Sequence, residues 1–164
     1  MDDAAEPARG LADLLRIPYQ ALTTRVLADL NAAGFADLRA AHLTVFKYLD
    51  PDGSRLTDLT AHAQMTKQSM AALIADLERW GYLDRAPDPA DGRARIVRHS
   101  ERGWSAARTA RASIHAFESE WERQIGPDRM RQFRAVLEEF AAVHPPAPRR
   151  PPDRGSRRAQ PLQR

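Results

Sequence analysis

The middle of the chain contains two short helical patterns in a row, and this pairing restricts the fold more than any other feature of the sequence. The first begins near Leu56 and has one small apolar side, formed with Leu59 and Ala63. Thr66 then predicts the N-cap of a second helix, which Gly81 ends. The apolar residues of this second helix recur at helical spacing: Met70, Leu73, Ile74, Leu77 and Trp80. Two such helices joined by a tight turn predict a helix-turn-helix, although Gln64 stands where that turn often has a glycine.

Two short strands are expected directly after this helix pair. Residues 82–86 and 94–98 contain β-branched or aromatic side chains, and a segment rich in proline, aspartate and glycine separates them at 87–93. A hairpin in this position is the wing of a winged helix-turn-helix, here with Arg93 at its tip and Arg95 nearby. We therefore predict a mainly α fold with a small β-hairpin wing.

Long amphipathic segments flank the winged helix-turn-helix on both sides. Before it, an apolar stripe predicts a helix over 11–30, in which Pro18 either causes a kink or marks the true start. A further helix is expected over 38–49. After it, aromatic and aliphatic spacing predicts helices over 100–125 and 128–142.

The flanking helices have more apolar surface than one lobe can cover, which indicates a homodimer. The dimer contact is expected to consist of Leu11, Leu15, Phe117, Trp121, Phe133, Leu137 and Phe140. An aromatic stripe of this kind is more often core than a cofactor site, so we expect no cofactor.

The sequence divides into four expected parts. These are a flexible N-terminus at 1–10, a dimerisation region at 11–36 and 100–143, a winged helix-turn-helix at 37–99, and a basic tail at 144–164. The tail contains many prolines and arginines but one large apolar residue, so burial cannot offset its ordering entropy and we expect it to be disordered. It is either an arm that binds phosphates non-specifically or an idle solvated end.

Composition excludes several classes of protein. The chain has no cysteine, which excludes disulfides, thiolate metal sites and thiol redox sensing. The five histidines lack ligand spacing, and no phosphate loop or nucleophile motif is present, so we expect neither a metal nor catalytic residues, and no enzyme. No stretch approaches the roughly 18 apolar residues of a membrane span, and the acidic start does not resemble a secretory signal. We expect a cytoplasmic protein that does not bind membranes.

Three motifs at fixed spacing carry a resemblance to a known family. They are Leu56-Thr57-Asp58-Leu59 through Thr66-Lys67-Gln68-Ser69, then Leu77-Glu78-Arg79-Trp80-Gly81-Tyr82-Leu83, then Asp88-Pro89-Ala90-Asp91-Gly92-Arg93, with Gly103 following the wing. Together they resemble the MarR family of bacterial transcription regulators, over all but the two termini. The resemblance implies a triangular homodimer that places its two recognition helices in successive major grooves of DNA and its wings in the adjacent minor grooves.

The resemblance also implies which residues contact double-stranded DNA. The expected contacts are Thr66, Lys67, Gln68 and Ser69 in the exposed first turn of the recognition helix, Ala71 and Ala72 in the next turn, and Asp91, Arg93 and Arg95 in the wing. Lysine can meet phosphate or guanine, glutamine an adenine edge, and hydroxyls phosphate, while the alanines keep the helix slim enough to approach thymine methyls.

Arg93 looks like the minor-groove arginine of the family, and Asp91 would hold its guanidinium by a charge-assisted bond. The alternative is an exposed ion pair of little consequence. Two positions depart from the family: His99 replaces an apolar strand residue, and Ala72 replaces a polar residue that often contacts DNA.

Members of the family often bind a small aromatic acid or phenol between the first two helices, the fifth helix and the DNA-binding lobe. Tyr19, His42 and Phe46 are expected to line such a site here, because a ring can stack on the ligand and an imidazole can bond its carboxylate. Ordinary packing between helices explains these residues equally well.

The function expected from this reasoning is sequence-specific DNA-binding transcriptional regulation. The leading hypothesis is a ligand-responsive repressor that binds a pseudo-palindromic operator as a homodimer. The alternative is a winged-helix protein-interaction module that does not bind a specific operator.

Overall fold

The computed structural model describes residues 9–143. In this range it contains six helices and one two-stranded antiparallel hairpin. The elements are α1 (Leu11–Ala32), α2 (Ala40–Tyr48), α3 (Leu56–Ala63), α4 (Lys67–Arg79), β1 (Leu83–Asp88), β2 (Asp91–His99), α5 (Glu101–Ile125) and α6 (Pro127–Val143). The predicted mainly α fold with a hairpin wing is confirmed. The flexibility predicted for the N-terminus falls mostly on residues 1–8, which lie outside the described residues, as does the predicted disordered tail at 144–164.

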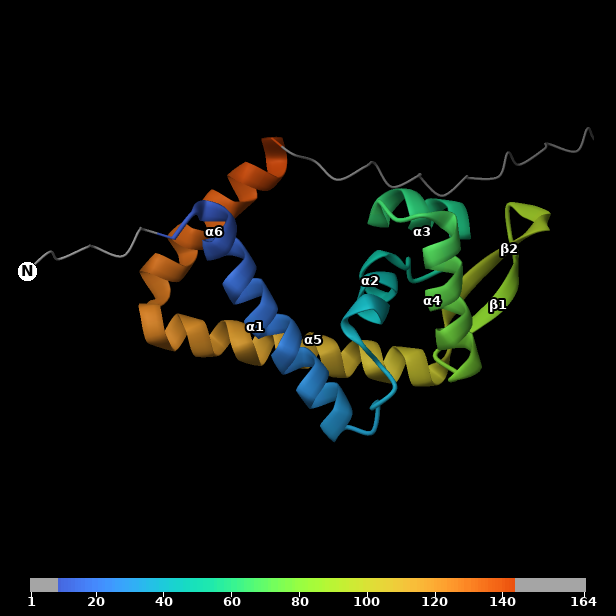
Figure 1. The fold of residues 1–164 in the computed structure, drawn as a ribbon, viewed down its shortest axis with the longest axis horizontal. Coiled ribbons are helices and arrows are strands. Elements are labelled where there is room, and N and C mark those ends of the chain that lie inside the picture. The colour runs from blue at the N-terminus through green and yellow to red at the C-terminus, as the bar shows by residue number, and fades with distance from the viewer. Residues whose placement is uncertain (1–8, 144–164) are drawn as a thin grey trace, which may run out of the picture.

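The helices form two ends joined by α5 (Figure 1). At one end, α2, α3, α4 and the hairpin form the winged-helix lobe. At the other, α6 folds back from the end of α5, and α1 crosses α5 and packs against it. None of the helices between residues 9 and 143 is long and apolar enough to cross a lipid bilayer.

The core of the lobe lies where α2, α3, α4 and the hairpin meet. Its most deeply buried side chains are Val45, Leu59, Met70, Ile74, Leu77 and Tyr82. The Tyr82 hydroxyl accepts a 3.0 Å hydrogen bond from Arg102 Nη2, and the same Nη2 lies 3.2 Å from the Asp37 carboxylate. Arg102 thereby ties the first turn of α5 to the lobe.

Three local expectations are resolved by the structure. Helix α1 begins at Leu11 and runs through Pro18, so Pro18 does not mark its start. Gln64 ends α3 with a φ of 52°, which is the left-handed conformation that glycine usually adopts at this position. The turn therefore forms although it has no glycine. The strands, predicted at 82–86 and 94–98, extend further toward the tip of the hairpin because Pro87 and Asp88 still pair across it.

His99 is a buried residue at the base of the wing. Its ring centroid lies 5.3 Å from that of Phe46 and 4.5 Å from that of Trp104. Its Nδ1 has no hydrogen-bond partner among the described residues, and burial lowers the pKa of the imidazole. His99 is therefore neutral in the folded protein near pH 7 and fills the place of an apolar side chain.

We expect the free energy of unfolding to fall as the pH drops below about 6.5, the ordinary pKa of histidine. In this range the unfolded chain binds a proton at His99 that the folded chain resists, because the folded-state pKa is lowered. Chemical denaturation at a series of pH values tests this. His99→Leu should reduce the pH dependence and leave the part due to His42, whose pKa burial also lowers. An unchanged pH dependence in His99→Leu would contradict the prediction.

Candidate nucleic-acid interface and ligand cavity

The first turn of α4 presents polar side chains to solvent. Thr66 caps the helix, because its Oγ1 accepts a 3.1 Å hydrogen bond from the backbone N–H of Ser69. The same Oγ1 donates to Ser69 Oγ at 2.8 Å, so the two hydroxyls hold each other. Lys67 and Gln68 lie between them and are exposed. The N-terminal end of α4 thus has free polar side chains on a well-defined helix end, which suits contact with phosphates and base edges.

The second turn of α4 is narrow. Ala72 is exposed one turn after Gln68, and Ala71 is half-buried one turn after Lys67. The opposite face of α4 is anchored in the lobe, where Met70, Ile74 and Leu77 are buried. This division between an apolar inner face and a slim polar outer face is what the sequence predicted for a recognition helix.

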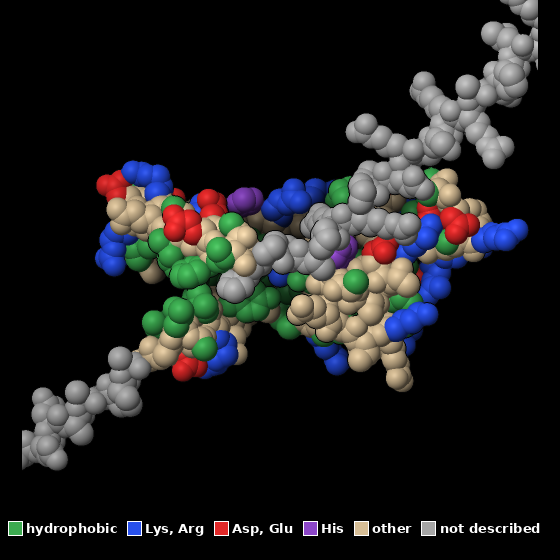
Figure 2. Space-filling view, turned by 90° about the horizontal axis from the view of Figure 1, so that it is seen from above, with side chains coloured by type: hydrophobic (Ala, Val, Ile, Leu, Met, Phe, Trp, Pro, Cys, Tyr) green, Lys and Arg blue, Asp and Glu red, His purple; other side chains and the backbone are tan. Residues whose placement is uncertain are grey.

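The wing projects beside this helix end. In Figure 1 the N-terminal end of α4 and the turn of the hairpin lie on the same side of the lobe, away from the junction of the hairpin with α5. Arg93 and Arg95 are both exposed. Figure 2 shows lysine and arginine side chains at the hairpin end and at other places on this face, and a group of exposed hydrophobic side chains beside charged ones at the opposite end. In this arrangement the N-terminal end of α4 and the positively charged hairpin can contact the same DNA duplex.

The contact predicted between Asp91 and the Arg93 guanidinium is not the one that the structure shows. Asp91 Oδ1 instead accepts a 3.1 Å hydrogen bond from the backbone N–H of Arg93. The other carboxylate oxygen faces Arg55, whose Nη2 lies 3.9 Å away. Asp91 therefore shapes the backbone of the tip, and the Arg93 side chain extends from it without an ion pair to any residue in 9–143.

A cavity of about 570 Å³ lies between α1, α2 and α5. Tyr19 and Phe46, two of the three residues predicted at a ligand site, line it. Most of the other lining side chains are apolar, and two are cations: Lys47 from α2 and Arg111 from α5. The cavity therefore combines aromatic and aliphatic walls with positive charge, which suits a small aromatic anion.

His42 was predicted to line the ligand site together with Tyr19 and Phe46, but it does not line this cavity. It lies on the other side of α2, where it is 3% exposed. Its Nδ1 accepts a 3.1 Å hydrogen bond from the backbone N–H of Arg39, and its Nε2 is 3.8 Å from an Asp76 carboxylate oxygen. Its ring also meets Trp80 edge-on at 5.1 Å. The sequence pattern could not tell which side of α2 faces α4.

Sequence reasoning missed the two cations of the cavity. Arg111 precedes Ile114 by one helical turn, and both line the cavity from α5. Lys47 follows the predicted residue Phe46 directly. The helical spacing of Arg111 and Ile114 indicates that they share one face of α5. The sequence alone does not show that this face lies opposite α2.

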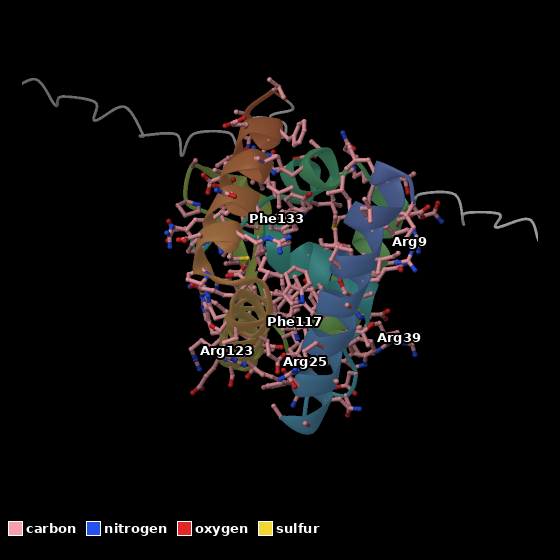
Figure 3. The ribbon with its side chains drawn as sticks, turned by 90° about the vertical axis from the view of Figure 1, so that its left-hand side faces the viewer. Arg9, Arg25, Arg39, Phe117, Arg123 and Phe133 are labelled. Carbon is pink, nitrogen blue, oxygen red and sulfur yellow. The ribbon has the colours of Figure 1, made fainter. Side chains whose placement is uncertain are left out.

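The residues predicted at a dimer contact lie at the end of the molecule away from the wing. Five of them are exposed: Leu11, Leu15, Phe133, Leu137 and Phe140. Phe117 and Trp121 are half-buried on α5, with ring centroids 4.7 Å apart. Figure 3 shows Phe133 and Phe117 between α6 and α1. Within the described chain, no group of three or more histidine or acidic side chains is arranged to hold a metal ion.

A helix-turn-helix, a wing and long flanking helices define this chain as a winged-helix protein. Residues 37–94 match the sequence model of the MarR family, and the described structure has the fold of MarR-family transcription regulators, so the predicted resemblance is confirmed.

Several crystal structures share this fold. A structure of MarR matches with a TM-score of 0.69 and 20% identity, covering 87% of this chain and 95% of that chain. The MarR family protein RV2887 of Mycobacterium tuberculosis, in complex with salicylic acid, matches with a TM-score of 0.60 and 25% identity, covering 82% of this chain and 98% of that chain. CouR of Rhodococcus jostii RHA1, bound to p-coumaroyl-CoA, matches with a TM-score of 0.63 and 21% identity, covering 86% of this chain and 99% of that chain. No curated protein matches the chain by sequence.

Proposed function

We propose that this protein is a cytoplasmic, sequence-specific DNA-binding transcription regulator without enzymatic activity. It acts as a homodimeric repressor on a pseudo-palindromic operator and dissociates from the DNA when it binds a small ligand. The observation that carries the proposal is that the N-terminal end of α4, whose first turn is polar and exposed, and the turn of the hairpin lie on one side of the lobe. In this proposal residues 37–99 bind DNA, and residues 11–36 with 100–143 hold the two protomers together.

Exposed apolar side chains support the homodimer. Phe140 is 54% exposed and Leu11 is 64% exposed in the protomer. A second copy that covers these faces removes them from water and places two recognition helices on one duplex. The two half-sites are then expected about one helical turn apart, roughly 10 base pairs.

The proposal is tested by selecting fragments of the parent genome with the purified protein in the presence of competitor DNA. A regulator of this kind enriches a small set of fragments that share a twofold-symmetric sequence, and binding persists at moderate salt. Binding that is equally weak to all fragments and disappears as salt is raised would contradict it, since that behaviour reports phosphate contacts alone.

Arg93→Ala is expected to weaken binding to the selected operator by about 1–3 kcal/mol, because it removes a side chain that reads the minor groove. Fluorescence anisotropy with labelled operator measures the loss, and sedimentation shows that the dimer persists. Arg131→Ala, which removes one charge from α6, is the matched control and should bind as the wild type does. Equal operator affinity of Arg93→Ala and the wild type would exclude the role given to Arg93.

The cavity between α1, α2 and α5 is the proposed effector site. Its aromatic residues Tyr19 and Phe46 can stack on a ring, while Lys47 and Arg111 can neutralise a carboxylate. Two proteins with the same fold, RV2887 and CouR, have been crystallised with salicylic acid and with p-coumaroyl-CoA. We therefore propose a small aromatic acid as the effector class.

Arg111→Ala is expected to weaken salicylate binding about tenfold or more, because a hydrogen bond to a charged group contributes about 1.5–3 kcal/mol. Calorimetric titration of salicylate measures the change. Arg123→Ala, on the same helix but outside the cavity, serves as control. If salicylate bound both variants equally well, Arg111 would have no part in holding the carboxylate.

A further inference from the structure

The start of α3 is connected to the wing tip by a charged contact. Arg55, the residue before α3, donates a hydrogen bond from Nε to Oδ2 of Asp88 near the end of β1, and its Nη2 forms an ion pair with the same oxygen. Asp88 is 8% exposed, so water screens the pair only in part. Its other oxygen accepts a 2.8 Å hydrogen bond from the backbone N–H of Ala90, inside the hairpin turn. One carboxylate thus joins the helix-turn-helix to the turn of the wing.

Both partners of this contact are charged near pH 7. The backbone N–H of Ala90 and the guanidinium of Arg55 lower the pKa of Asp88. The hydrogen bond to Asp88 raises the pKa of Arg55. The pair is therefore a permanent ion pair over the range in which the protein would bind DNA.

Strand pairing alone does not fix the tip. The hairpin ladder is regular from Leu83 and His99 as far as Pro87 and Arg95, but Asp88 then pairs with Asp91. Residues 92–94 consequently have no partner across the hairpin, and Arg93 is among them. Such a bulged segment needs other contacts to hold its side chains in one direction.

Those contacts lead back to Arg55. The backbone N–H of Arg93 is held by Asp91, and Asp91 faces Nη2 of Arg55 at 3.9 Å. On its other side, Arg55 directly precedes α3, which packs against α4. A continuous set of contacts therefore runs from the recognition helix through α3 and Arg55 to the backbone of Arg93.

We propose that Arg55, held by Asp88, is a positioning residue that fixes the wing tip and Arg93 relative to α4. The proposal rests on the proposed function, since it concerns how the two DNA-reading elements keep their spacing. If the distance between α4 and the wing tip is fixed in the free protein, both can enter neighbouring grooves of the DNA without the free-energy cost of ordering the tip on binding.

The variant Asp88→Asn distinguishes the positioning of the wing tip through Arg55 from a direct effect of the Asp88 charge on DNA binding. Removing a negative charge near DNA should strengthen binding if charge alone matters, because the repulsion from phosphates falls. If Asp88 holds the tip through Arg55, the same change weakens specific binding, by about tenfold if part of the contribution of Arg93 is lost. The two explanations thus predict opposite signs.

The experiment compares Asp88→Asn, Arg55→Gln and Arg55→Lys with the wild type on the selected operator. Arg79→Gln is the matched control, because Arg79 pairs with Asp76 at the far end of α4. We expect weaker binding in Asp88→Asn and Arg55→Gln, partial recovery in Arg55→Lys, and no change in Arg79→Gln. When Arg93→Ala is already present, Asp88→Asn should weaken binding no further, since the side chain that it positions is gone.

Hydrogen exchange of the free protein gives a readout that does not need DNA. The backbone amides of residues 90–94 should exchange faster in Asp88→Asn and Arg55→Gln, and the rest of the lobe should exchange as in the wild type. Unchanged exchange at the tip, or Asp88→Asn binding as tightly as the wild type or more tightly, overturns the proposal. If the wild type selects no DNA, the proposed function is wrong, and the exchange rates still decide whether Arg55 holds the tip.

Discussion

Phe140→Asp is expected to convert the proposed homodimer into monomers and to reduce operator affinity by about 100-fold or more, the range in which linking two binding sites acts. Phe140 is 54% exposed in the protomer, so the substitution leaves the protomer core intact. In the proposed dimer it places a carboxylate in an apolar contact, where burying an unpaired charge is strongly unfavourable. The monomer retains one recognition helix and one wing and can occupy one half-site.

Sedimentation equilibrium measures the oligomeric state of Phe140→Asp, and circular dichroism verifies that its helices are retained. Ala135→Asp is the matched control, because Ala135 is exposed and lies on the opposite face of α6. It should remain a dimer and bind the operator normally. If Phe140→Asp sediments as a dimer at micromolar concentration, the contact surface has been placed on the wrong face of α6.

Gly103→Ala is expected to destabilise the protein by about 3 kcal/mol, the upper part of the usual range for adding volume to a packed site. Gly103 is buried in the first turn of α5, and a Cβ there would lie 2.1 Å from the carbonyl oxygen of Tyr82. That oxygen also accepts a 3.0 Å hydrogen bond from the backbone N–H of Ser100. The added methyl must therefore push α5 away from the base of the wing.

The sign of the change in the free energy of unfolding of Gly103→Ala decides this test. In a helix without steric conflict, glycine to alanine stabilises by up to about 1 kcal/mol. Chemical denaturation of Gly103→Ala should instead show a clear loss, whereas Gly92→Ala, where no atom lies within 4 Å of the added Cβ, should change the free energy of unfolding little. Equal or greater stability of Gly103→Ala would contradict the close approach of α5 to Tyr82.

The parts of the fold that the sequence predicted correctly depend on local patterns. The cap at Thr66 follows from a hydroxyl before an apolar helical stripe, and it forms as expected. The helix-turn-helix, the wing and the flanking helices likewise follow from spacing within single segments. The hairpin was predicted too short, because Pro87 and Asp88 are weak strand formers that pair only in the context of the ladder.

The candidate site was predicted less completely because its contacts join distant segments. Asp91 was assigned to the guanidinium of Arg93, but it binds the backbone of that residue and faces Arg55. His42 was assigned to the cavity but packs on the opposite side of α2. In each case the residue type was informative, and the partner depended on the packing of another element.

The sequence by itself determined the class of fold, the polar face of α4 and the cationic tip of the wing, because helical periodicity, capping and turn chemistry act within a few residues of the chain. Only the tertiary structure decided that Lys47 and Arg111 share a cavity and that Arg55 reaches Asp88. These pairs lie far apart along the chain, and the free energy that brings them together comes from the packing of whole helices and the hairpin rather than from any local pattern.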